Sequence, residues 1–397
     1  MQTELKKEHE NWDFSARQHS QLNWYAETDA PPGVPVIDLS ILRGAEGAGE
    51  RQRALDALRE AVTKSGFFYV KNYGITDKEI EAISNATRGF FGHPEDYKQA
   101  FDRHEQVRGY TGYRLESTAR FFGTGQGKDL CMKYTMGPEL SPEEVRERIT
   151  SEEDIASNAY SPNIFPDAGF RDAWVNYYER IHRTSLDLLE AMGEALNLSP
   201  ESRSVLSEML IEKSCGELRF FQYPDVPLNA CADVPGNGTD RMAAHFDMDV
   251  ITLLYQTPCE NGFISLEALI GDEFVKIPAI RGTLVVNLGE VLRLLMGNFI
   301  KATIHRVVRP PQRYHLGSAR DVLVFFQAPP LNARLRPLLL EPGVGSDTIF
   351  DQLYREAGGI GYVTFSQLRA RLFGEFIRHM EVSDAKHESD AHLFSKQ

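Results

Sequence analysis

The feature that most constrains the fold is a run of short β-rich segments in the second half of the chain. Each is four to seven residues long and rich in aliphatic and aromatic residues, and turn signals such as Gly271-Asp272 separate neighbours. Segments of this length and spacing are typical of an antiparallel sandwich or barrel. The strands that we expect are Leu218–Tyr223, Val250–Gln256, Phe263–Leu269, Phe274–Ile277, Leu284–Leu288, Thr303–Val308 and Val322–Gln327.

The first half carries helical signals instead. Leu55, Leu58 and Val62 recur at helical spacing and precede Gly66, and Thr76 begins a capping box. A long stripe of aromatic and aliphatic residues, from Phe170 to Leu196, predicts a helix with one buried face. The helical period returns in the segment from Thr364 to Met380. We therefore predict a mostly β chain with a helical N-terminal region.

These patterns divide the chain into four parts. Residues 1–33 are polar and predict an N-terminal arm, and residues 34–215 predict a helical region that adds edge strands to the core. The β core spans residues 216–335. A helical extension and a polar tail follow in residues 336–397.

Composition narrows the possible partners. The 397-residue chain has a net charge of −14, which argues against nucleic-acid and anionic-membrane surfaces. No apolar run is long enough to span a bilayer or to serve as a secretory signal, so we expect a cytoplasmic chain; a monomer is compatible, and the oligomeric state stays open. The four cysteines form no CxxC pair and indicate reduced thiols, so a metal site must use His and carboxylate ligands.

His245-Phe246-Asp247 is the sharpest local signal. In an extended segment, residues two apart lie on one face, so this imidazole and this carboxylate could bind one metal ion. Asp249 shares that face, and spacing alone does not choose between the two acids. His305 lies in a later β-rich segment that antiparallel pairing can bring beside the first histidine. Two His and one carboxylate leave three coordination positions open, which suits non-haem Fe(II).

Arg320 opens the last strand of the β core. A guanidinium that faces an apolar interior needs an anion, and a carboxylate can accept two of its hydrogen bonds. Tyr223, which precedes Pro224, could place a phenol in the same pocket. The spacing is compatible with a small dicarboxylate that bridges the metal and Arg320. The alternative is a surface salt bridge between Arg320 and Asp321 or a nearby Glu.

Several motifs, in this order along the chain, together resemble the isopenicillin N synthase-like group of 2-oxoglutarate/Fe(II)-dependent dioxygenases. The resemblance covers about Val34 to Pro329. The segments that carry it are Val34–Leu39 (VPVIDL), Gly66–Ile75 (GFFYVKNYGI), His245–Asp247 with Ile251–Gln256, Leu284–Glu290 (LVVNLGE), Lys301–Val308 (KATIHRVV), and Arg320 with Phe325, Phe326 and Pro329.

The resemblance implies a double-stranded β-helix, or jelly-roll, core. It implies Fe(II) held by His245, Asp247 and His305, with Arg320 and Tyr223 binding the far carboxylate of 2-oxoglutarate. It also implies that O2 and 2-oxoglutarate are consumed while an unactivated C–H of a small, carboxylate-bearing metabolite is oxidised, by hydroxylation, desaturation or oxidative cyclisation. Such reactions are common in secondary metabolism.

Some positions depart from the family pattern or are weaker. The family's Ser, two residues after the Arg, is Val322 here, and Ser318 is a candidate replacement. On the substrate side, Arg108 resembles a residue that lines the pocket in some members, and its alternative is a solvated charge. Tyr134 and Phe326 are candidate lining residues whose alternative is core packing.

Two other functions stay open at this point. In the oxidase branch of the same group, the matching Arg and Tyr bind the carboxylate of the substrate, and O2 is used without 2-oxoglutarate. A non-catalytic jelly-roll binding protein is the second alternative. The complete set of two His and one carboxylate argues against it.

Overall fold

A computed structural model describes residues 12–44, 47–124, 127–149, 151–208, 214–226, 240–339, 348–358 and 362–374. The α-helices are α2 Leu39–Arg43, α3 Ala48–Lys64, α4 Asp77–Phe91, α5 Glu95–Gln99, α6 Thr118–Phe121, α7 Pro142–Arg148, α8 Glu152–Ala156, α9 Ala168–Ala195, α10 Pro200–Glu208, α11 Glu290–Leu295 and α12 Ile349–Glu356. The strands are β1 Val36–Asp38, β2 Phe67–Lys71, β3 Asp102–Arg103, β4 Arg108–Thr111, β5 Met132–Met136, β6 Glu217–Tyr223, β7 Asp240–His245, β8 Ile251–Gln256, β9 Leu266–Ile270, β10 Glu273–Lys276, β11 Thr283–Leu288, β12 His305–Val308, β13 Arg320–Gln327, β14 Arg334–Leu335 and β15 Val363–Thr364.

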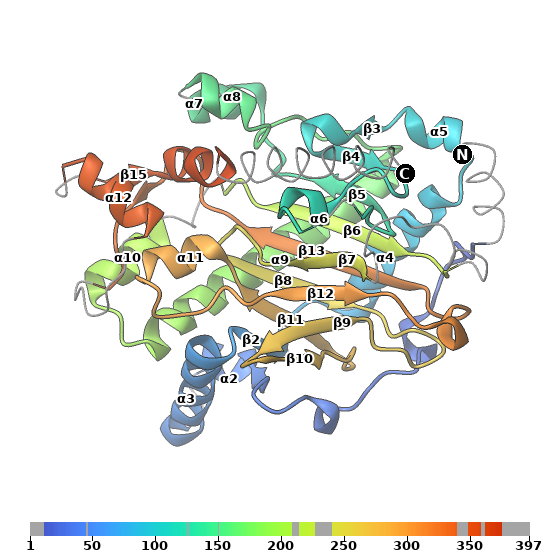
Figure 1. Ribbon diagram of the computed structural model, residues 1–397, viewed down its shortest axis with the longest axis horizontal. Coiled ribbons are helices and arrows are strands. Elements are labelled where there is room, and N and C mark those ends of the chain that lie inside the picture. Colours follow the sequence, from blue (N-terminus) through green and yellow to red (C-terminus); the bar gives the residue numbers. More distant parts are fainter. Residues whose placement is uncertain are drawn as a thin grey trace, which may run out of the picture.

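Most strands belong to two sheets that lie one in front of the other (Figure 1). The large sheet has nine strands in the order β1-β2-β11-β8-β13-β6-β5-β4-β3, and the small sheet has four in the order β10-β9-β12-β7. All neighbours are antiparallel except β1 and β2, which are parallel. Strands from the first half of the chain therefore extend the sheet that the second half builds.

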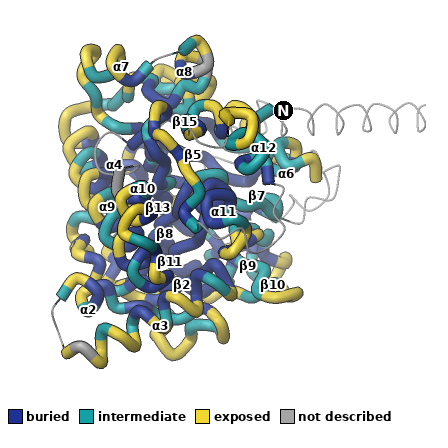
Figure 2. The backbone as a smooth tube through the Cα atoms, turned by 90° about the vertical axis from the view of Figure 1, so that its left-hand side faces the viewer, coloured by how far each residue is buried: buried dark blue, intermediate teal, exposed yellow. Residues whose placement is uncertain are grey.

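The central strands of the large sheet, such as β8, β11 and β13, are buried on both faces, and Figure 2 shows them in dark blue. Alternate side chains of one strand reach different cores, because successive residues of a strand point to opposite faces. In β6, Leu218 and Phe220 belong to the core that packs against the helices, whereas Phe221 and Tyr223 belong to the core that includes residues of the small sheet. The space between the sheets is thus lined from both sides, and the candidate site lies there.

Helix α9 covers the outer face of the large sheet and confirms the predicted stripe. The Asp167 side chain caps the helix by accepting a hydrogen bond from the Phe170 N–H. One face of the helix is buried, including Phe170, Trp174, Tyr178, Ile181, Leu188 and Met192. The helix packs beside α3 and α4 and against β8 and β13.

The predicted end of the first long helix is also confirmed. Gly66 follows α3 with a φ of +64°. A Cβ at this position would lie 2.5 Å from the Lys301 carbonyl oxygen, so only glycine fits. This tight turn sends the chain directly into β2, whose Phe67 and Tyr69 line the space between the sheets.

The N-terminal arm is polar, yet part of it packs onto the core. His19 is buried, and its Nδ1 lies 2.9 Å from the Tyr255 hydroxyl. Tyr25 forms a parallel β-bridge with Ile280. The arm therefore contributes to one end of the space between the sheets.

The prediction of a mostly β chain is confirmed only in part, because the chain as a whole has mixed helical and strand content. Sequence reasoning missed β3, β4, β5, β7, β14 and β15, most of which have five residues or fewer. The C-terminal helix is present over residues 365–374, and its predicted continuation to Met380 lies outside the described residues. Within the described ranges, none of the helices has both the length and the apolar composition needed to cross a lipid bilayer.

Candidate metal centre

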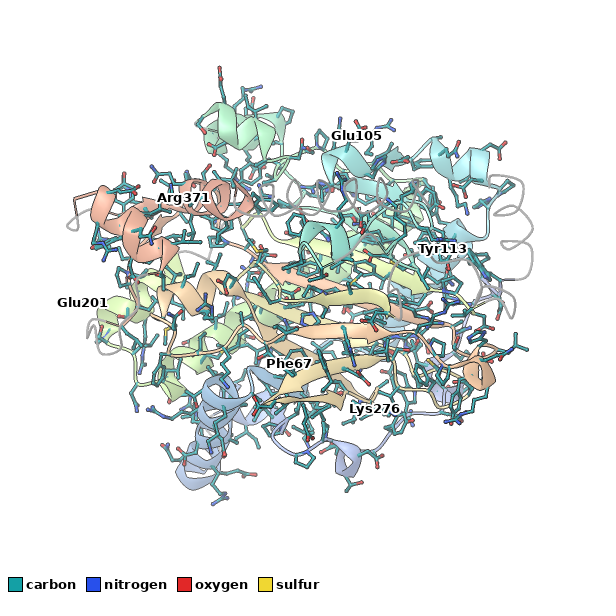
Figure 3. The ribbon with its side chains drawn as sticks, in the orientation of Figure 1. Phe67, Glu105, Tyr113, Glu201, Lys276 and Arg371 are labelled. Carbon is teal, nitrogen blue, oxygen red and sulfur yellow. The ribbon has the colours of Figure 1, made fainter. Side chains whose placement is uncertain are left out.

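Strand pairing brings the two candidate histidines together. His245 ends β7 and His305 begins β12, and the two residues are direct partners in the antiparallel ladder. The ring centroids lie 4.3 Å apart. Phe67, labelled in Figure 3, packs edge-on against His305 at 5.6 Å, and Phe122 packs against His245 at 5.9 Å. Aromatic rings thus shield both imidazoles.

Each histidine is held in the same way. The Nδ1 of His245 lies 2.7 Å from the Ala243 carbonyl oxygen, and the Nδ1 of His305 lies 3.1 Å from the Thr303 carbonyl oxygen. A proton on each Nδ1 donates to that carbonyl and leaves the Nε2 lone pair free to bind a metal. The two Nε2 atoms lie 3.9 and 3.8 Å from the Asp247 Oδ1.

Asp247 supplies the third ligand atom. Its Oδ2 accepts hydrogen bonds from the Thr252 hydroxyl at 2.5 Å and the Asn287 amide at 2.6 Å, so its Oδ1 is the oxygen that faces the histidines. Strand β7 ends at His245, and the chain bends only after Asp247, at residues 248–250, before β8 begins. The hydrogen bonds from Thr252 and Asn287 fix the orientation of the carboxylate.

The structure also resolves the choice between the two acids. The three possible ligand atoms of His245, Asp247 and His305 lie within 4.8 Å of one another, and Asp249 is not in the group. Burial, and next the negative charge of Glu217, raise the pKa of Asp249 to about 7. Asp249 belongs to a separate charged group.

The protonation states fit a metal site. Burial, and then the neighbouring His305, lower the pKa of His245 to about 4. Burial opposes ionisation of Asp247, but the two histidines and the hydrogen bonds from Asn287 and Thr252 hold the pKa of this carboxyl below its usual value. At neutral pH the site therefore offers a neutral imidazole and a carboxylate. Two imidazole nitrogens and one carboxylate oxygen form the set that non-haem Fe(II) takes, and bound iron supplies the position where O2 is activated.

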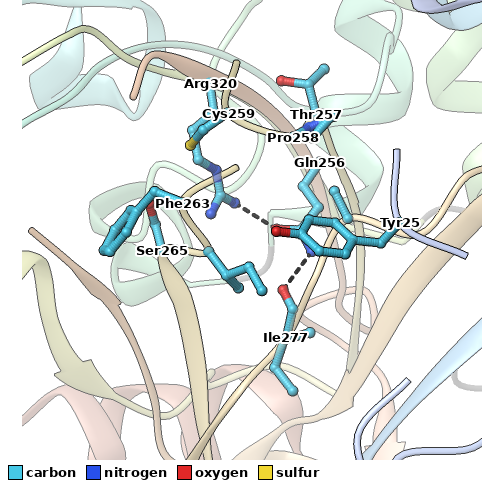
Figure 4. Close-up of a pocket in the computed structure, with 11 residues that line it drawn as sticks. Tyr25, Gln256, Thr257, Pro258, Cys259, Phe263, Ser265, Ile277 and Arg320 are labelled. Carbon is cyan, nitrogen blue, oxygen red and sulfur yellow. Dashed lines mark hydrogen bonds between the residues drawn. The ribbon is translucent and has the colours of Figure 1, made fainter. Parts of the chain in front are cut away.

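Arg320 and Tyr223 lie opposite each other at the other end of this interior, as partners in the β13–β6 ladder. Both are buried, and the guanidinium carbon lies 5.6 Å from the centre of the Tyr223 ring. The Arg320 Nη2 donates to the Gln256 side-chain oxygen at 2.8 Å, as Figure 4 shows. The alternative pair with Asp321 is wrong, because the Asp321 carboxylate accepts from Arg88 at 3.0 Å.

Sequence reasoning missed a second buried arginine nearby. Arg241 of β7 is fully buried, and its Nη1 and Nη2 donate to the Ser318 carbonyl, the Ser318 hydroxyl and the Pro224 carbonyl, all uncharged. Burial lowers the pKa of both guanidinium groups. Among the described residues, neither Arg241 nor Arg320 forms an ion pair.

Arg108 and Tyr134, two of the candidate substrate-binding residues, are buried and bind backbone carbonyls. Arg108 is completely buried and donates to the carbonyls of Ser161, Val107 and Ala159, so it is not a solvated charge; its contacts are those of a structural arginine. The Tyr134 hydroxyl donates to the Ile164 carbonyl, and its ring lies in the aromatic core against α9. These positions favour packing roles, and substrate contact by either side chain stays a prediction.

Phe326 lies closer to the candidate metal ligands. In the β13–β8 ladder it is the partner of Thr252, the residue that supports Asp247. The guanidinium of Arg219 lies 4.9 Å from the centre of its ring. Arg219 is a further residue that sequence reasoning missed, although its alternation with Phe221 and Tyr223 in β6 predicts that all three share one face.

Comparisons with known proteins agree with this geometry. A family model described as the N-terminal part of the non-haem dioxygenase in morphine synthesis matches residues 34–168. The model of the 2OG-Fe(II) oxygenase superfamily matches residues 215–329, which contain all three candidate metal ligands.

Several curated relatives cover most of the chain. Deacetoxycephalosporin C hydroxylase of Streptomyces clavuligerus is 31% identical over 303 residues, which are 75% of this chain and 84% of the relative. Deacetoxycephalosporin C synthase of Amycolatopsis lactamdurans is 32% identical over 306 residues, covering 76% and 85%. An alpha-ketoglutarate dependent kainoid synthase of Digenea simplex is 27% identical over 328 residues, covering 80% and 81%.

The fold has solved counterparts as well. A 2OG-Fe(II) oxygenase family protein from Caulobacter crescentus superposes with a TM-score of 0.61 at 23% identity, over 82% of this chain and 99% of that one. At this identity the likeness supports the fold alone. The matched family models, the curated relatives and the two-histidine, one-carboxylate triad confirm the predicted family: the chain belongs to the 2OG-Fe(II) oxygenase superfamily and is an Fe(II)- and 2-oxoglutarate-dependent oxygenase of small metabolites.

Proposed function

We propose that this oxygenase oxidises an unactivated C–H bond of a carboxylate-bearing metabolite, by hydroxylation, desaturation or oxidative cyclisation. The observation that carries the proposal is a charged wall beside the metal triad, on the inner face of β5 and β6. It is formed by Arg219 and Lys133 with their acidic partners. The relatives support this class of reaction, since several are named for the synthesis or hydroxylation of small metabolites.

The proposed architecture is a double-stranded β-helix formed by the two facing sheets. Antiparallel pairing within the small sheet and through most of the large one supports it, as does the apolar core between the sheets. We retain the proposed division into a helical region at 34–215 and an oxygenase core at 216–335. The two matched family models, which span 34–168 and 215–329, support a division at about this place.

In the proposed site, Fe(II) is held by His245, Asp247 and His305, and the far carboxylate of 2-oxoglutarate is bound by Arg320 and Tyr223. Arg320 supports this role because it is a buried cation without an ion pair among the described residues, and its Nε has no hydrogen-bond partner. A buried guanidinium of this kind favours a carboxylate ligand. The Tyr223 hydroxyl supports it too, because its contact with the Met242 sulfur, at 3.8 Å, is a weak hydrogen bond that a carboxylate can replace.

The charged wall consists of Arg219 and Lys133 with their partners. Arg219 pairs with Glu217 at 2.5 Å, and Lys133 pairs with Glu116 at 2.5 Å. Through its contact with Phe326, Arg219 lies one layer of side chains from Thr252 and Asp247.

The same inner face carries an unsatisfied group. Thr135, the ladder partner of Arg219, is buried, and its hydroxyl has no hydrogen-bond partner. Two cations and a free hydroxyl on one face suit a carboxylate with a neighbouring polar group.

The test is a substrate screen. Purified protein with Fe(II), 2-oxoglutarate and O2 is given a panel of organic acids together with the matching primary amides, and succinate release is measured. We expect some of the acids to stimulate succinate release more than about tenfold over the uncoupled rate, and the matching amides to have little effect.

A variant pair sharpens the screen. Arg219→Gln is expected to raise the KM for the acid about tenfold or more and to leave the dissociation constant of 2-oxoglutarate unchanged, because a charge pair between a partly buried guanidinium and the ligand is lost. Arg146→Gln, at an exposed position of α7, is the control and should match the wild type. Amides that stimulate turnover as strongly as the acids would contradict the proposed substrate class.

A further inference from the structure

The site lacks a hydroxyl where the family pattern has one. The inner residue of β13 next to Arg320 on the metal side is Val322, an apolar side chain in the core between the sheets. A carboxylate that binds Arg320 has more lone pairs than the guanidinium fills, and buried carboxylates usually accept further hydrogen bonds. Another donor is therefore needed.

Ser318, the candidate from the sequence, is already engaged. Its hydroxyl donates to the His315 carbonyl at 2.6 Å and accepts from the Arg241 Nη2 at 2.7 Å. It uses its one proton on a backbone carbonyl, and it does not line the cavity beside Arg320. Ser318 thus holds Arg241 in place and has no proton to offer a ligand.

Ser265, unlike Ser318, has a hydroxyl proton that is available to a ligand. It lies just before β9, 1% exposed, and the Val308 N–H donates to its carbonyl at 2.8 Å, which fixes its backbone. Its hydroxyl is buried without a hydrogen-bond partner of normal geometry. The neighbouring Cys259 thiol is only a weak acceptor, and it directs its own proton to a backbone carbonyl at 3.2 Å. The Ser265 proton is therefore available to a ligand.

Two unsatisfied donors lie at one cavity, the Ser265 hydroxyl and the Arg320 Nε. Figure 4 shows both residues at this narrow cavity with Gln256, and the lining also includes the apolar Phe263 and Ile277 and the polar Thr257 and Cys259. Buried donors without partners are rare in folded proteins, and an acceptor that reaches both would satisfy them together.

We propose that Ser265 donates a hydrogen bond to the far carboxylate of 2-oxoglutarate beside Arg320. It thereby replaces, from the small sheet, the serine that β13 lacks. This inference rests on the cosubstrate position given under Proposed function.

The test compares two 2-oxo acids that differ in the far carboxylate. Anaerobic Fe(II) enzyme is titrated with 2-oxoglutarate and with pyruvate, and the visible band of the iron chelate reports each dissociation constant. In Ser265→Ala the dissociation constant of 2-oxoglutarate should rise about tenfold, the usual effect of losing a hydrogen bond to a charged group, and that of pyruvate should not change. Adding Val322→Ser to this variant should recover most of the affinity for 2-oxoglutarate.

The possible failures are distinct. If Ser265→Ala binds 2-oxoglutarate as the wild type does, or if it weakens both 2-oxo acids equally, Ser265 does not contact the far carboxylate and the inference is overturned. If the wild-type enzyme binds pyruvate as tightly as 2-oxoglutarate, the far-carboxylate site itself is wrong, and the cosubstrate position under Proposed function is overturned together with the inference.

Discussion

The two ends of the space between the sheets differ in whether the protein itself satisfies the buried polar and charged groups. At the metal end, every polar group that supports the ligands is satisfied by the protein: both Nδ1 atoms face backbone carbonyls, and the outer carboxylate oxygen of Asp247 accepts from Thr252 and Asn287. At the other end, Arg320 and Arg241 are buried without an ion pair among the described residues, and the Nε of each has no hydrogen-bond partner.

The difference indicates how each end meets its ligand. A metal needs ligands that are deprotonated and already oriented, and the hydrogen bonds around the triad provide both. A buried guanidinium without a counter-charge favours an anionic ligand, and it destabilises the empty protein until the anion binds. We therefore expect substitutions of the metal ligands to abolish turnover. Substitution of a buried arginine at the other end should weaken cosubstrate binding and raise the free energy of unfolding.

The largest effect should come from Asp247→Ala. It removes the one anionic ligand and should lower iron affinity and turnover by more than about a hundredfold, since even a lost supporting hydrogen bond costs about 10–100-fold. Iron content after gel filtration and succinate release measure the effect. Asp272→Ala, in the exposed turn between β9 and β10, is the control, and retained iron in Asp247→Ala would contradict the assignment of the ligand.

Arg320→Met should have opposite effects on 2-oxoglutarate affinity and on the stability of the protein without 2-oxoglutarate. The dissociation constant of 2-oxoglutarate should rise about a hundredfold, because a buried charge pair is lost. The free energy of unfolding of the cosubstrate-free protein should rise by about 2 kcal/mol, because an uncompensated buried charge is replaced by an apolar side chain of similar length.

Chemical denaturation with and without 2-oxoglutarate measures both effects. The exposed Arg313→Met is the control and should change neither quantity. A destabilised Arg320→Met protein would show that this arginine is structural rather than held for an anion.

Asn287→Leu tests the orientation of the metal ligands. The Oδ2 of Asp247 would keep only the hydrogen bond from Thr252, and iron affinity should fall about tenfold or more. Affinity for 2-oxoglutarate at saturating iron should change little. Competition with a chelator measures the iron affinity, and an unchanged value would mean that Thr252 alone orients the carboxylate.

The smallest effect should come from Gln256→Leu. Gln256 orients Arg320 through one hydrogen bond, so its loss should weaken 2-oxoglutarate binding about fivefold, the usual worth of a single hydrogen bond. Iron content should match that of the wild type. A loss of iron in this variant would contradict the independence of the two ends.

Much of the site could be predicted from the sequence because its signals are local. His245-Phe246-Asp247, the β-rich context of His305 and the position of Arg320 at a strand start are visible without coordinates. Sequence spacing could not choose Asp247 over Asp249. The choice depends on hydrogen bonds from β8 and β11, strands that follow later in the chain.

Other roles depended on contacts that no local pattern contains. Ser318 lies two residues from Arg320 and was the expected donor beside it, yet it supports Arg241, which lies 77 positions away in the chain. Arg108 is charged, and yet it is buried among backbone carbonyls. In each case the partner is distant in sequence and is set by the way the sheets and loops pack.

The sequence by itself determined the periodicities of helix and strand, the types of metal ligand and the family. Each of these depends on residues that are near one another in the chain or on motifs in a fixed order. The tertiary structure alone decided which acid faces the histidines, which arginines are left without a counter-charge, and which serine keeps a free hydroxyl. Burial and hydrogen bonding are properties of the assembled core, so they exist only after distant segments have packed together.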